Sequence, residues 1–381
     1  MLKSLALSIL FSGLLALPAA AQMAGVPTTT SDVNGIIAKS AADDAAQYKG
    51  LDTYNLLPNR SESKFVTIDP GAQADAMGAG VNILGYDPYW KDGQAGNYTD
   101  DTFAKIKAAG FSTVRLNLFI FGKSAAHLGV NGNIDPKWLK KLDWVVAEAE
   151  KHDLNIILDE HDFEDCSEAK PQDCATLLMV TWRQLARRYM NEPNSVMFEL
   201  LNEPHGNLNG EAWNQVLAQV VQVVRATNPT RNLIIGPTHY NSMDDLDQLK
   251  LPADDHIIVT FHYYKPMTFT HQGAVWAHEE NLHDVHFGSK AELKTINDDF
   301  NTVATWANTH NRAIFLGEFG AYDKAPMADR VTYDSAVART AEAHDFPWAY
   351  WQFSSDFLLY DFSKQSFVAP ILKALRPDAQ P

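Results

Sequence analysis

Two glutamates, Glu203 and Glu318, are the side chains of this sequence whose surroundings best suit bond-breaking chemistry. Each ends a short apolar run, residues 196–203 and 313–318, with the length and composition of a buried strand. Cleaving a glycosidic bond needs a protonated carboxyl for the leaving oxygen and an ionised carboxyl for the anomeric carbon, at a fixed separation. Because strands fix such distances better than loops do, the pair predicts sugar chemistry.

The elements that must position these acids form a regular series, in which strand-like and helix-like patterns alternate eight times. Strands are expected at residues 81–84, 113–118, 155–158, 196–201, 233–235, 257–262, 314–317 and 348–353. Helical patterns follow at residues 100–109, 136–152, 176–190, 212–226, 244–249, 293–308, 329–343 and 368–375. Eight such pairs predict an α/β fold, a single (β/α)8 TIM barrel over residues 76–376. An open doubly wound sheet is the alternative, but its glycine-rich turn does not follow the first strand.

The residues outside the barrel fall into three segments. Residues 1–21 combine a basic start, an apolar run and a small-residue cleavage site, as in a secretory signal peptide. The apolar run is too short for a permanent membrane span. Residues 22–75 are expected to form an N-terminal tail or wrapping segment, and residues 377–381 a C-terminal tail. The sequence therefore predicts an exported protein, periplasmic or extracellular.

The formal net charge of −16 bears on the partners. An acidic surface repels phosphate backbones and anionic lipids, which disfavours nucleic acid and membrane partners, whereas a neutral polysaccharide remains compatible. We expect a monomer that needs neither cofactor nor metal. The histidine-rich residues 278–286 do not change this, because His278 and His283 are five apart and do not share a helix face.

The chain has two cysteines, Cys166 and Cys174, in a polar stretch. In an oxidising compartment they are expected to form one disulfide. Two free buried thiols are the less favoured alternative because the neighbours are charged. A catalytic cysteine is disfavoured further, since no basic neighbour would lower the thiol pKa.

Several other polar side chains fall at expected strand ends, where the active site of such a barrel lies. Arg115 sits within an apolar strand, so it must meet a carboxylate, either an active-site acid or a structural one. His161 alone is weak evidence, and Glu160 or Asp162 could equally be the partner that matters. Asn202 has a short amide able to bind a sugar hydroxyl or the neighbouring carboxylate.

Three more candidates follow from strand geometry. Alternation places His262 and Tyr264 on one face, toward the cavity, where each would bias the protonation of a different acid. Trp351 offers a flat indole for a pyranose ring, although it could equally fill the core. We expect burial and repulsion from Glu318 to raise the pKa of Glu203, and Arg115 and Tyr264 to keep Glu318 ionised.

With these residues, the chain resembles glycoside hydrolase family 5, the bacterial cellulase type, over roughly residues 76–376. The motifs that carry the resemblance are residues 201–206 around Glu203 and residues 316–320 around Glu318. The resemblance implies a retaining mechanism with Glu203 as acid/base and Glu318 as nucleophile. It also implies site roles for Arg115, His161, Asn202, His262, Tyr264 and Trp351. Residues 270–276 are similar to bacterial endoglucanases, which makes Trp276 a candidate stacking platform.

Two positions depart from the family pattern. Asp162 stands where related cellulases often have a second histidine, and Gln352 where some have a glutamate. We expect both to affect sugar recognition rather than bond cleavage. The resulting hypothesis is an exported retaining endo-β-1,4-glucanase acting on β-glucan. The alternatives are a retaining β-mannanase, mixed-linkage glucanase or β-1,3-glucanase, and a non-catalytic polysaccharide-binding barrel, which would not need both acids.

Overall fold

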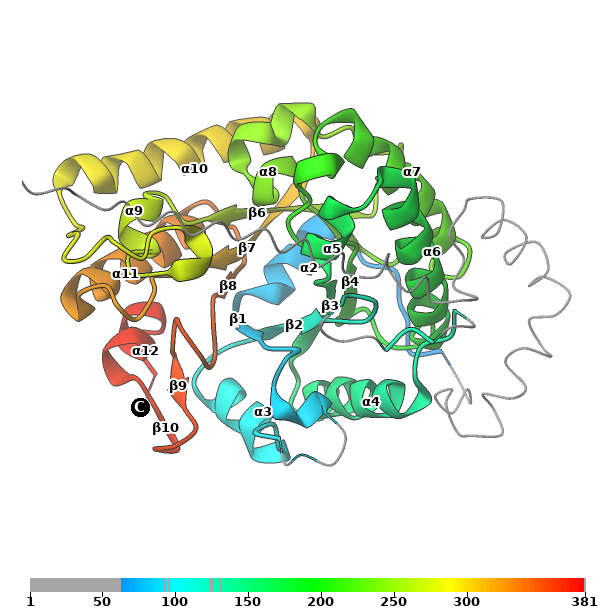
Figure 1. Ribbon diagram of the computed structural model, residues 1–381, viewed down its shortest axis with the longest axis horizontal. Coiled ribbons are helices and arrows are strands. Elements are labelled where there is room, and N and C mark those ends of the chain that lie inside the picture. Colours follow the sequence, from blue (N-terminus) through cyan, green and yellow to red (C-terminus); the bar gives the residue numbers. More distant parts are fainter. Residues whose placement is uncertain (1–62, 92–93, 95, 124–126, 130–131, 380–381) are drawn as a thin grey trace, which may run out of the picture.

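The computed structural model describes residues 63–91, 94, 96–123, 127–129 and 132–379. The expected signal peptide and most of the expected N-terminal tail lie outside the described residues. Eight parallel strands form a closed barrel in sequence order, with β1 paired to both β2 and β8 (Figure 1). The predicted (β/α)8 barrel is therefore confirmed.

Each strand is followed by helical structure on the outside of the barrel. The strands are β1 (Ala79–Ile83), β2 (Thr113–Leu118), β3 (Asn155–Glu160), β4 (Val196–Glu199), β5 (Leu233–Ile235), β6 (Ile257–Tyr263), β7 (Ala313–Phe319) and β8 (Trp348–Tyr350). The outer helices are α3 (Asp100–Ala108), α4 (Pro136–Lys151), α6 (Pro171–Arg188), α7 (Glu211–Arg225), α10 (Lys290–His310), α11 (Met327–Ala343) and α12 (Ala369–Leu375). A 3-10 helix, η3 (Met243–Gln248), takes the helix position between β5 and β6.

Shorter elements decorate the loops. They are α5 (Phe163–Glu168), α8 (Thr238–Asn241), α9 (Met267–Thr270), the 3-10 turns η1 (Pro88–Trp90), η2 (Gly206–Leu208) and η4 (Val275–Ala277), and a hairpin of β9 (Tyr360–Asp361) and β10 (Ser366–Phe367). No helix among the described residues is both long and apolar enough to cross a membrane.

Local sequence explains where the longer helices begin and end. α10 begins at a capping box in which Ser289 and Glu292 satisfy each other's backbone amides. It ends at Asn311, which adopts the left-handed conformation typical of a helix terminus. α4 begins with Pro136 after the capping side chain of Asp135.

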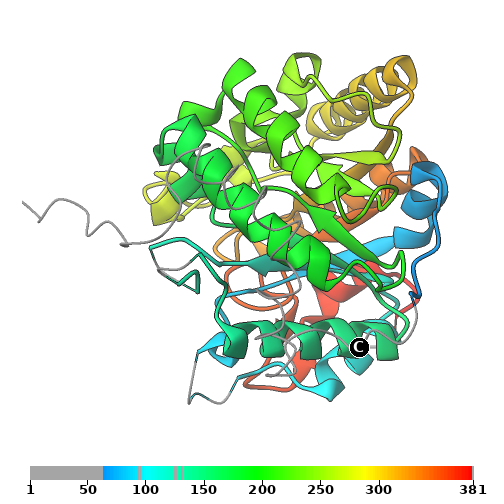
Figure 2. The same ribbon diagram turned by 90° about the vertical axis from the view of Figure 1, so that its right-hand side faces the viewer.

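One end of the barrel is closed by helix α2 (Pro70–Met77), which Figure 2 shows in blue at the edge of the molecule. Met77 is fully buried and packs on an inward-facing apolar layer, which we call the base layer: Ile157, Met197, Ile234, Ile258, Phe315 and Ala349. The sequence prediction placed residues 70–75 in the N-terminal tail or wrapping segment. In the structure these residues lie in helix α2, at the base of the barrel.

The end of β4 differs from the sequence prediction. Glu203 was expected to close this strand, but β4 ends at Glu199. Strand-like hydrogen bonds continue irregularly, from Leu200 N to Ile234 O (3.2 Å) and from Asn202 N to Glu160 O (2.8 Å). Glu203 then turns away with a φ of 39°, which no regular strand allows. Glu318, by contrast, lies within β7 as expected.

Candidate active site

Glu203 and Glu318 face each other at the carboxyl end of the barrel, with His262 between them. One oxygen of each carboxyl and one ring nitrogen of His262 lie within 4.8 Å of one another. His262 Nδ1 is 2.6 Å from Glu203 Oε1 and 3.7 Å from Glu318 Oε2. The Glu203 side chain is 15% exposed and that of Glu318 is 6% exposed, so both acids are largely buried.

Glu318 is held by two donors, one from β2 and one from the residue that follows β6. Arg115 Nη1 donates to Glu318 Oε1 at 2.7 Å, and the Tyr264 hydroxyl donates to Oε2 at 2.9 Å. A register shift between Phe261 and His262 sets His262 opposite Glu318 in the pairing of β6 with β7. Both oxygens of Glu318 thus accept hydrogen bonds, which favours its ionised form.

Arg115 lies at the centre of a buried network with more acids than its own charge can neutralise. Its guanidinium binds Glu199 through two hydrogen bonds of 2.7 and 2.9 Å and lies 3.1 Å from Asp159. It also donates to Asn82 and Asn202, at 2.8 and 2.7 Å. Arg115 therefore pairs with three carboxylates, including Glu318.

Burial decides the protonation of these groups. It raises the pKa of Glu203 to about 8, against the opposing effect of Arg115. Burial also raises the pKa of Glu318, while His262 and Arg115 lower it. The pKa of Asp159 rises to about 7 by burial, and that of His262 falls to about 4 for the same reason. At neutral pH, Glu203 keeps its proton beside a neutral His262.

His161 is fixed from two sides. Its Nδ1 lies 2.6 Å from Asp159 Oδ2, and its ring stacks on Trp351 with centroids 5.7 Å apart. Neither Glu160 nor Asp162 is its partner, contrary to the alternatives that the sequence left open. Strand alternation was the available signal for Asp159, since residues 159 and 161 share a face.

Two site residues were missed from the sequence because each contacts Arg115 from a different strand, which no local pattern indicates. Glu199 lies four residues before Glu203, and Asn82 lies in β1, and both meet Arg115. Asn241 was missed too: its amide nitrogen is 3.2 Å from His262 Nε2. Asn241 follows His239 and Tyr240 in three consecutive positive-φ residues, a conformation that the sequence does not indicate.

Trp276 lies in the 3-10 turn η4, at the surface. Its side chain is 55% exposed and meets the ring of Tyr322 edge to face, with centroids 4.9 Å apart. An exposed indole fixed by a neighbouring ring is suited to stacking on a sugar.

The two departures from the family pattern act inside the protein. The Asp162 carboxylate is buried and accepts hydrogen bonds from the amides of Ile120 and Phe121, at 2.6 and 2.7 Å. Gln352, oriented to satisfy its amide, accepts from the Trp351 indole at 3.2 Å and donates to Ser354 O at 3.1 Å. Asp162 shapes the loop after β2, and Gln352 orients Trp351.

Two groups of described side chains are close enough to share a metal ion. The first is the site itself, Glu203, His262 and Glu318. The second is Asp100, Glu148 and His152, but the Lys151 ammonium lies 2.7 Å from Asp100 and 3.1 Å from Glu148. A cation of the protein thus already neutralises this second group.

Cys166 and Cys174 form a disulfide with Cα atoms 4.9 Å apart. The bond joins α5 to the start of α6 beside the loop that follows Glu203. Both cysteines are fully buried.

A closed (β/α)8 barrel that holds two buried carboxyls face to face at the carboxyl end of its strands defines a glycoside hydrolase. The family model Cellulase (glycosyl hydrolase family 5) matches residues 74–357, and the chain belongs to this family. Endoglucanase H of Acetivibrio thermocellus is 27% identical over 320 residues, which cover 81% of this chain and 34% of that protein. The chain thus spans about a third of that relative's length.

Solved structures similar to this chain support the same family assignment. The chain is 34% identical to the cellulose synthase subunit Z of Clostridioides difficile, with a TM-score of 0.72 over 78% of this chain and 99% of that one. It is 32% identical to Thermotoga maritima Cel5A in complex with mannotriose, with a TM-score of 0.74 over 81% of this chain and 100% of that one. Cel5A was also solved with cellobiose, at 33% identity, a TM-score of 0.73 and the same coverage.

Proposed function

We propose that this chain is an exported retaining endoglucanase that hydrolyses internal β-1,4-glucosidic bonds, with Glu203 as acid/base and Glu318 as nucleophile. One observation carries the proposal: an oxygen of the Glu203 carboxyl lies within 4.8 Å of an oxygen of the Glu318 carboxyl. Retaining enzymes hold their carboxyls about 5–5.5 Å apart, whereas inverting enzymes need roughly 6.5–9.5 Å to admit a water. The separation therefore favours double displacement.

In the first step, an oxygen of the Glu318 carboxylate bonds to the anomeric carbon as the glycosidic bond breaks. The Glu203 proton passes to the departing oxygen, which leaves as an alcohol. In the second step, Glu203 takes a proton from water, and the water oxygen displaces Glu318 from the sugar. Both glutamates return to their starting states, and the configuration at the anomeric carbon is retained.

The proton balance of the site supports this division of roles. At neutral pH, Glu203 is protonated because burial raises its pKa to about 8, as a general acid requires. Glu203 and Glu318 disfavour each other's ionised forms. Once Glu318 is an ester, its charge is gone, so the pKa of Glu203 falls and Glu203 can act as the base.

β-Glucan is the favoured substrate, because the relatives include Endoglucanase H and a Cel5A solved with cellobiose. Mannan is the second candidate, because Cel5A was also solved with mannotriose. Every residue of the proposed mechanism comes from one chain, so the proposal includes a monomer. Export rests on residues 1–21, and a secreted product that begins at Gln22 would support it.

Product profiles on carboxymethylcellulose, barley β-glucan, mannan and laminarin test the substrate class. A fast loss of carboxymethylcellulose viscosity is expected for internal cleavage. Cleavage of mannan alone would move the assignment to the second candidate. Binding without hydrolysis on all four polymers would contradict the enzyme and favour a binding barrel.

A further inference from the structure

The backbone at Glu203 adopts a conformation that needs outside support. Its φ of 39° lies in the left-handed region, which is costly for a residue other than glycine. The β4 ladder has already ended at Glu199, so regular strand pairing does not hold it. Such a conformation persists only where neighbouring groups fix it. The neighbours of Glu203 therefore determine where its carboxyl lies.

His205 is the nearest of these supports. Its Nδ1 lies 2.9 Å from the backbone oxygen of Glu203, so the ring N–H donates to that carbonyl. The Tyr240 ring stacks on the imidazole ring of His205, with centroids 4.1 Å apart and an interplanar angle of 17°. Tyr240 N also donates to Pro204 O at 3.4 Å. His205 is 8% exposed, and its hydrogen bond is to the backbone of Glu203 rather than to the carboxyl.

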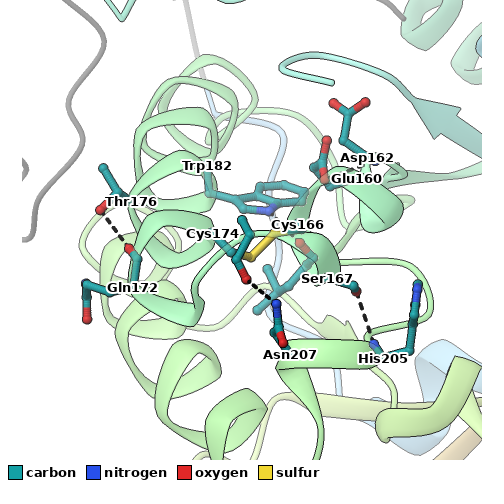
Figure 3. The surroundings of a disulfide bond; sticks show 12 residues. Glu160, Asp162, Cys166, Ser167, Gln172, Cys174, Thr176, Trp182, His205 and Asn207 are labelled. Atoms are coloured by element: carbon teal, nitrogen blue, oxygen red, sulfur yellow. Dashed lines mark hydrogen bonds between the residues drawn. A yellow bond between two sulfur atoms is a disulfide. The ribbon is translucent and has the colours of Figure 1, made fainter. Parts of the chain in front are cut away.

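His205 rests in turn on residues 163–174, which contain the Cys166–Cys174 disulfide and which we call the disulfide segment. The backbone amide of His205 donates to Ser167 Oγ at 3.2 Å, a contact drawn in Figure 3. The Asn207 amide donates to the carbonyls of Glu168 and Ala169, at 3.0 and 3.2 Å. Between them, Gly206 has a φ of 54°, and a Cβ there would meet the Ser167 carbonyl at 3.1 Å. The loop after Glu203 thus lies directly against the disulfide segment.

Two side chains of the disulfide segment contact the His205 ring directly. Glu164 of the disulfide segment places Oε2 at 3.3 Å from His205 Nε2. The ring of Phe163 lies edge to face with His205, with centroids 5.8 Å apart. Through space, His205 lowers and Glu164 raises the pKa of Glu203, both less than burial and Arg115 affect it. The disulfide segment therefore affects both the position of Glu203, through His205, and the pKa of Glu203, through Glu164.

We propose that His205 and the disulfide segment together form a positioning unit for Glu203, which governs how well the enzyme protonates its leaving group. This inference rests on the proposed acid/base role of Glu203. His205 is a positioning residue, because it contacts the backbone of Glu203 and not the reacting atoms. Loss of the unit impairs proton donation more than any other step.

The experiment compares two substrates whose leaving groups differ in their need for a proton. Cellotetraose releases an alcohol and needs the general acid, whereas 2,4-dinitrophenyl β-cellobioside releases a stabilised phenolate and does not. Two variants divide the functions of the ring. His205→Phe keeps the stack on Tyr240 but loses the hydrogen bond, and His205→Asn keeps a side-chain donor where Nδ1 lies. The parameter measured is kcat/KM, which reports the steps up to formation of the glycosyl-enzyme.

For His205→Phe, we expect kcat/KM on cellotetraose to fall about tenfold, because small displacements of a catalytic group are costly. On the dinitrophenyl substrate it should change less than about twofold. His205→Asn should recover most of the loss on cellotetraose. An equal loss on both substrates, or no loss on either, would overturn the proposal.

Two further variants test the segment itself. Ser167→Ala removes the acceptor for His205 N and leaves no large cavity, so it serves as the test if His205→Phe does not fold. The double variant Cys166→Ser with Cys174→Ser opens the segment. Both should show the same selective loss on cellotetraose, and variants that behave as wild type would contradict a role for the segment.

Glu203→Ala separates this inference from the proposed function. It should lose cellotetraose hydrolysis, keep attack on the dinitrophenyl substrate, and gain turnover with azide. If Glu203→Ala fails this pattern, the acid/base assignment is wrong. If Glu203→Ala follows it but His205→Phe shows no selectivity, only the positioning unit is wrong.

Discussion

The two ends of the barrel interior are built from the same strands but have opposite chemistry. On β3, Ile157 belongs to the base layer and Asp159, two residues further, contacts Arg115. On β4, Met197 belongs to the base layer and Glu199 binds Arg115 through two hydrogen bonds. Because alternate residues of a strand face the same side, one step of two residues takes the interior from an apolar core to a charged site.

The difference teaches which end stabilises the fold and which performs chemistry. The base layer removes apolar surface from water, because all its members are apolar and fully buried. The carboxyl end of the barrel holds Arg115 with Asp159, Glu199 and Glu318, which we call the upper layer. Burying these three carboxyls is costly unless each is paired or keeps a proton. We therefore expect mutations in the base to change stability, and mutations in the upper layer to change activity.

The largest effect is expected from Glu318→Ala. Without the nucleophile, kcat should fall on the order of 10⁵-fold or more. The fold should persist, because Arg115 keeps Glu199 and Asp159 as partners. Initial rates on cellotetraose and a melting curve measure the two outcomes. Undiminished hydrolysis by this variant would refute the nucleophile role.

Met197→Ala tests whether the base layer contributes to stability rather than to activity. Removing a fully buried methionine from the base layer should lower the free energy of unfolding by about 2–5 kcal/mol. The kcat/KM of the folded variant should stay near wild type. Met190→Ala is the matched control, since Met190 is 37% exposed and its loss should cost less than about 0.5 kcal/mol. A large loss of activity in folded Met197→Ala would contradict the claim that the base layer affects only stability.

Asp159→Asn sharpens the comparison within the upper layer. The negative charge of Asp159 raises the pKa of Glu203, so its removal should lower that pKa. Glu203 must be protonated to act as the acid, so wild-type kcat/KM should fall above about pH 8. In Asp159→Asn this basic limb should lie at lower pH, as a pH profile on cellotetraose will show. A basic limb that moves upward would contradict this account.

The smallest effect is expected from Trp276→Ala, outside both layers. Loss of an exposed stacking ring should raise KM by less than about tenfold, since aromatic contacts contribute about 0.5–1.5 kcal/mol beyond area burial. The kcat value should change little, because Arg115, Tyr264 and His262, rather than Trp276, contact the carboxyls. Steady-state kinetics on cellotetraose and on a shorter oligosaccharide would reveal the change, and an unchanged KM on both would exclude the platform.

Much of this architecture follows from patterns that a single sequence carries. The eight alternating patterns predict the barrel because burial repeats every two residues in strands and about every 3.6 in helices. Glu203 and Glu318 could be predicted because acids at the ends of apolar runs are unusual. His262 and Tyr264 could be paired with these acids because alternation puts them on one face.

The remaining features depend on contacts between distant segments. The three carboxyls that meet Arg115 come from strands β3, β4 and β7, and no local pattern indicates that they share one guanidinium. The left-handed turn that brings Asn241 to His262 has no glycine to mark it. The support of Glu203 by His205 and Ser167 likewise depends on how α5 packs beside the loop after β4.

The most direct test of the central claim is the anomeric configuration of the first-formed product. Proton NMR during the first minutes of cellotetraose hydrolysis distinguishes the β-anomer from the α-anomer before mutarotation mixes them. Double displacement by Glu318 with Glu203 as acid/base predicts the β-anomer first. Initial release of the α-anomer would show inversion and contradict the roles assigned to both glutamates.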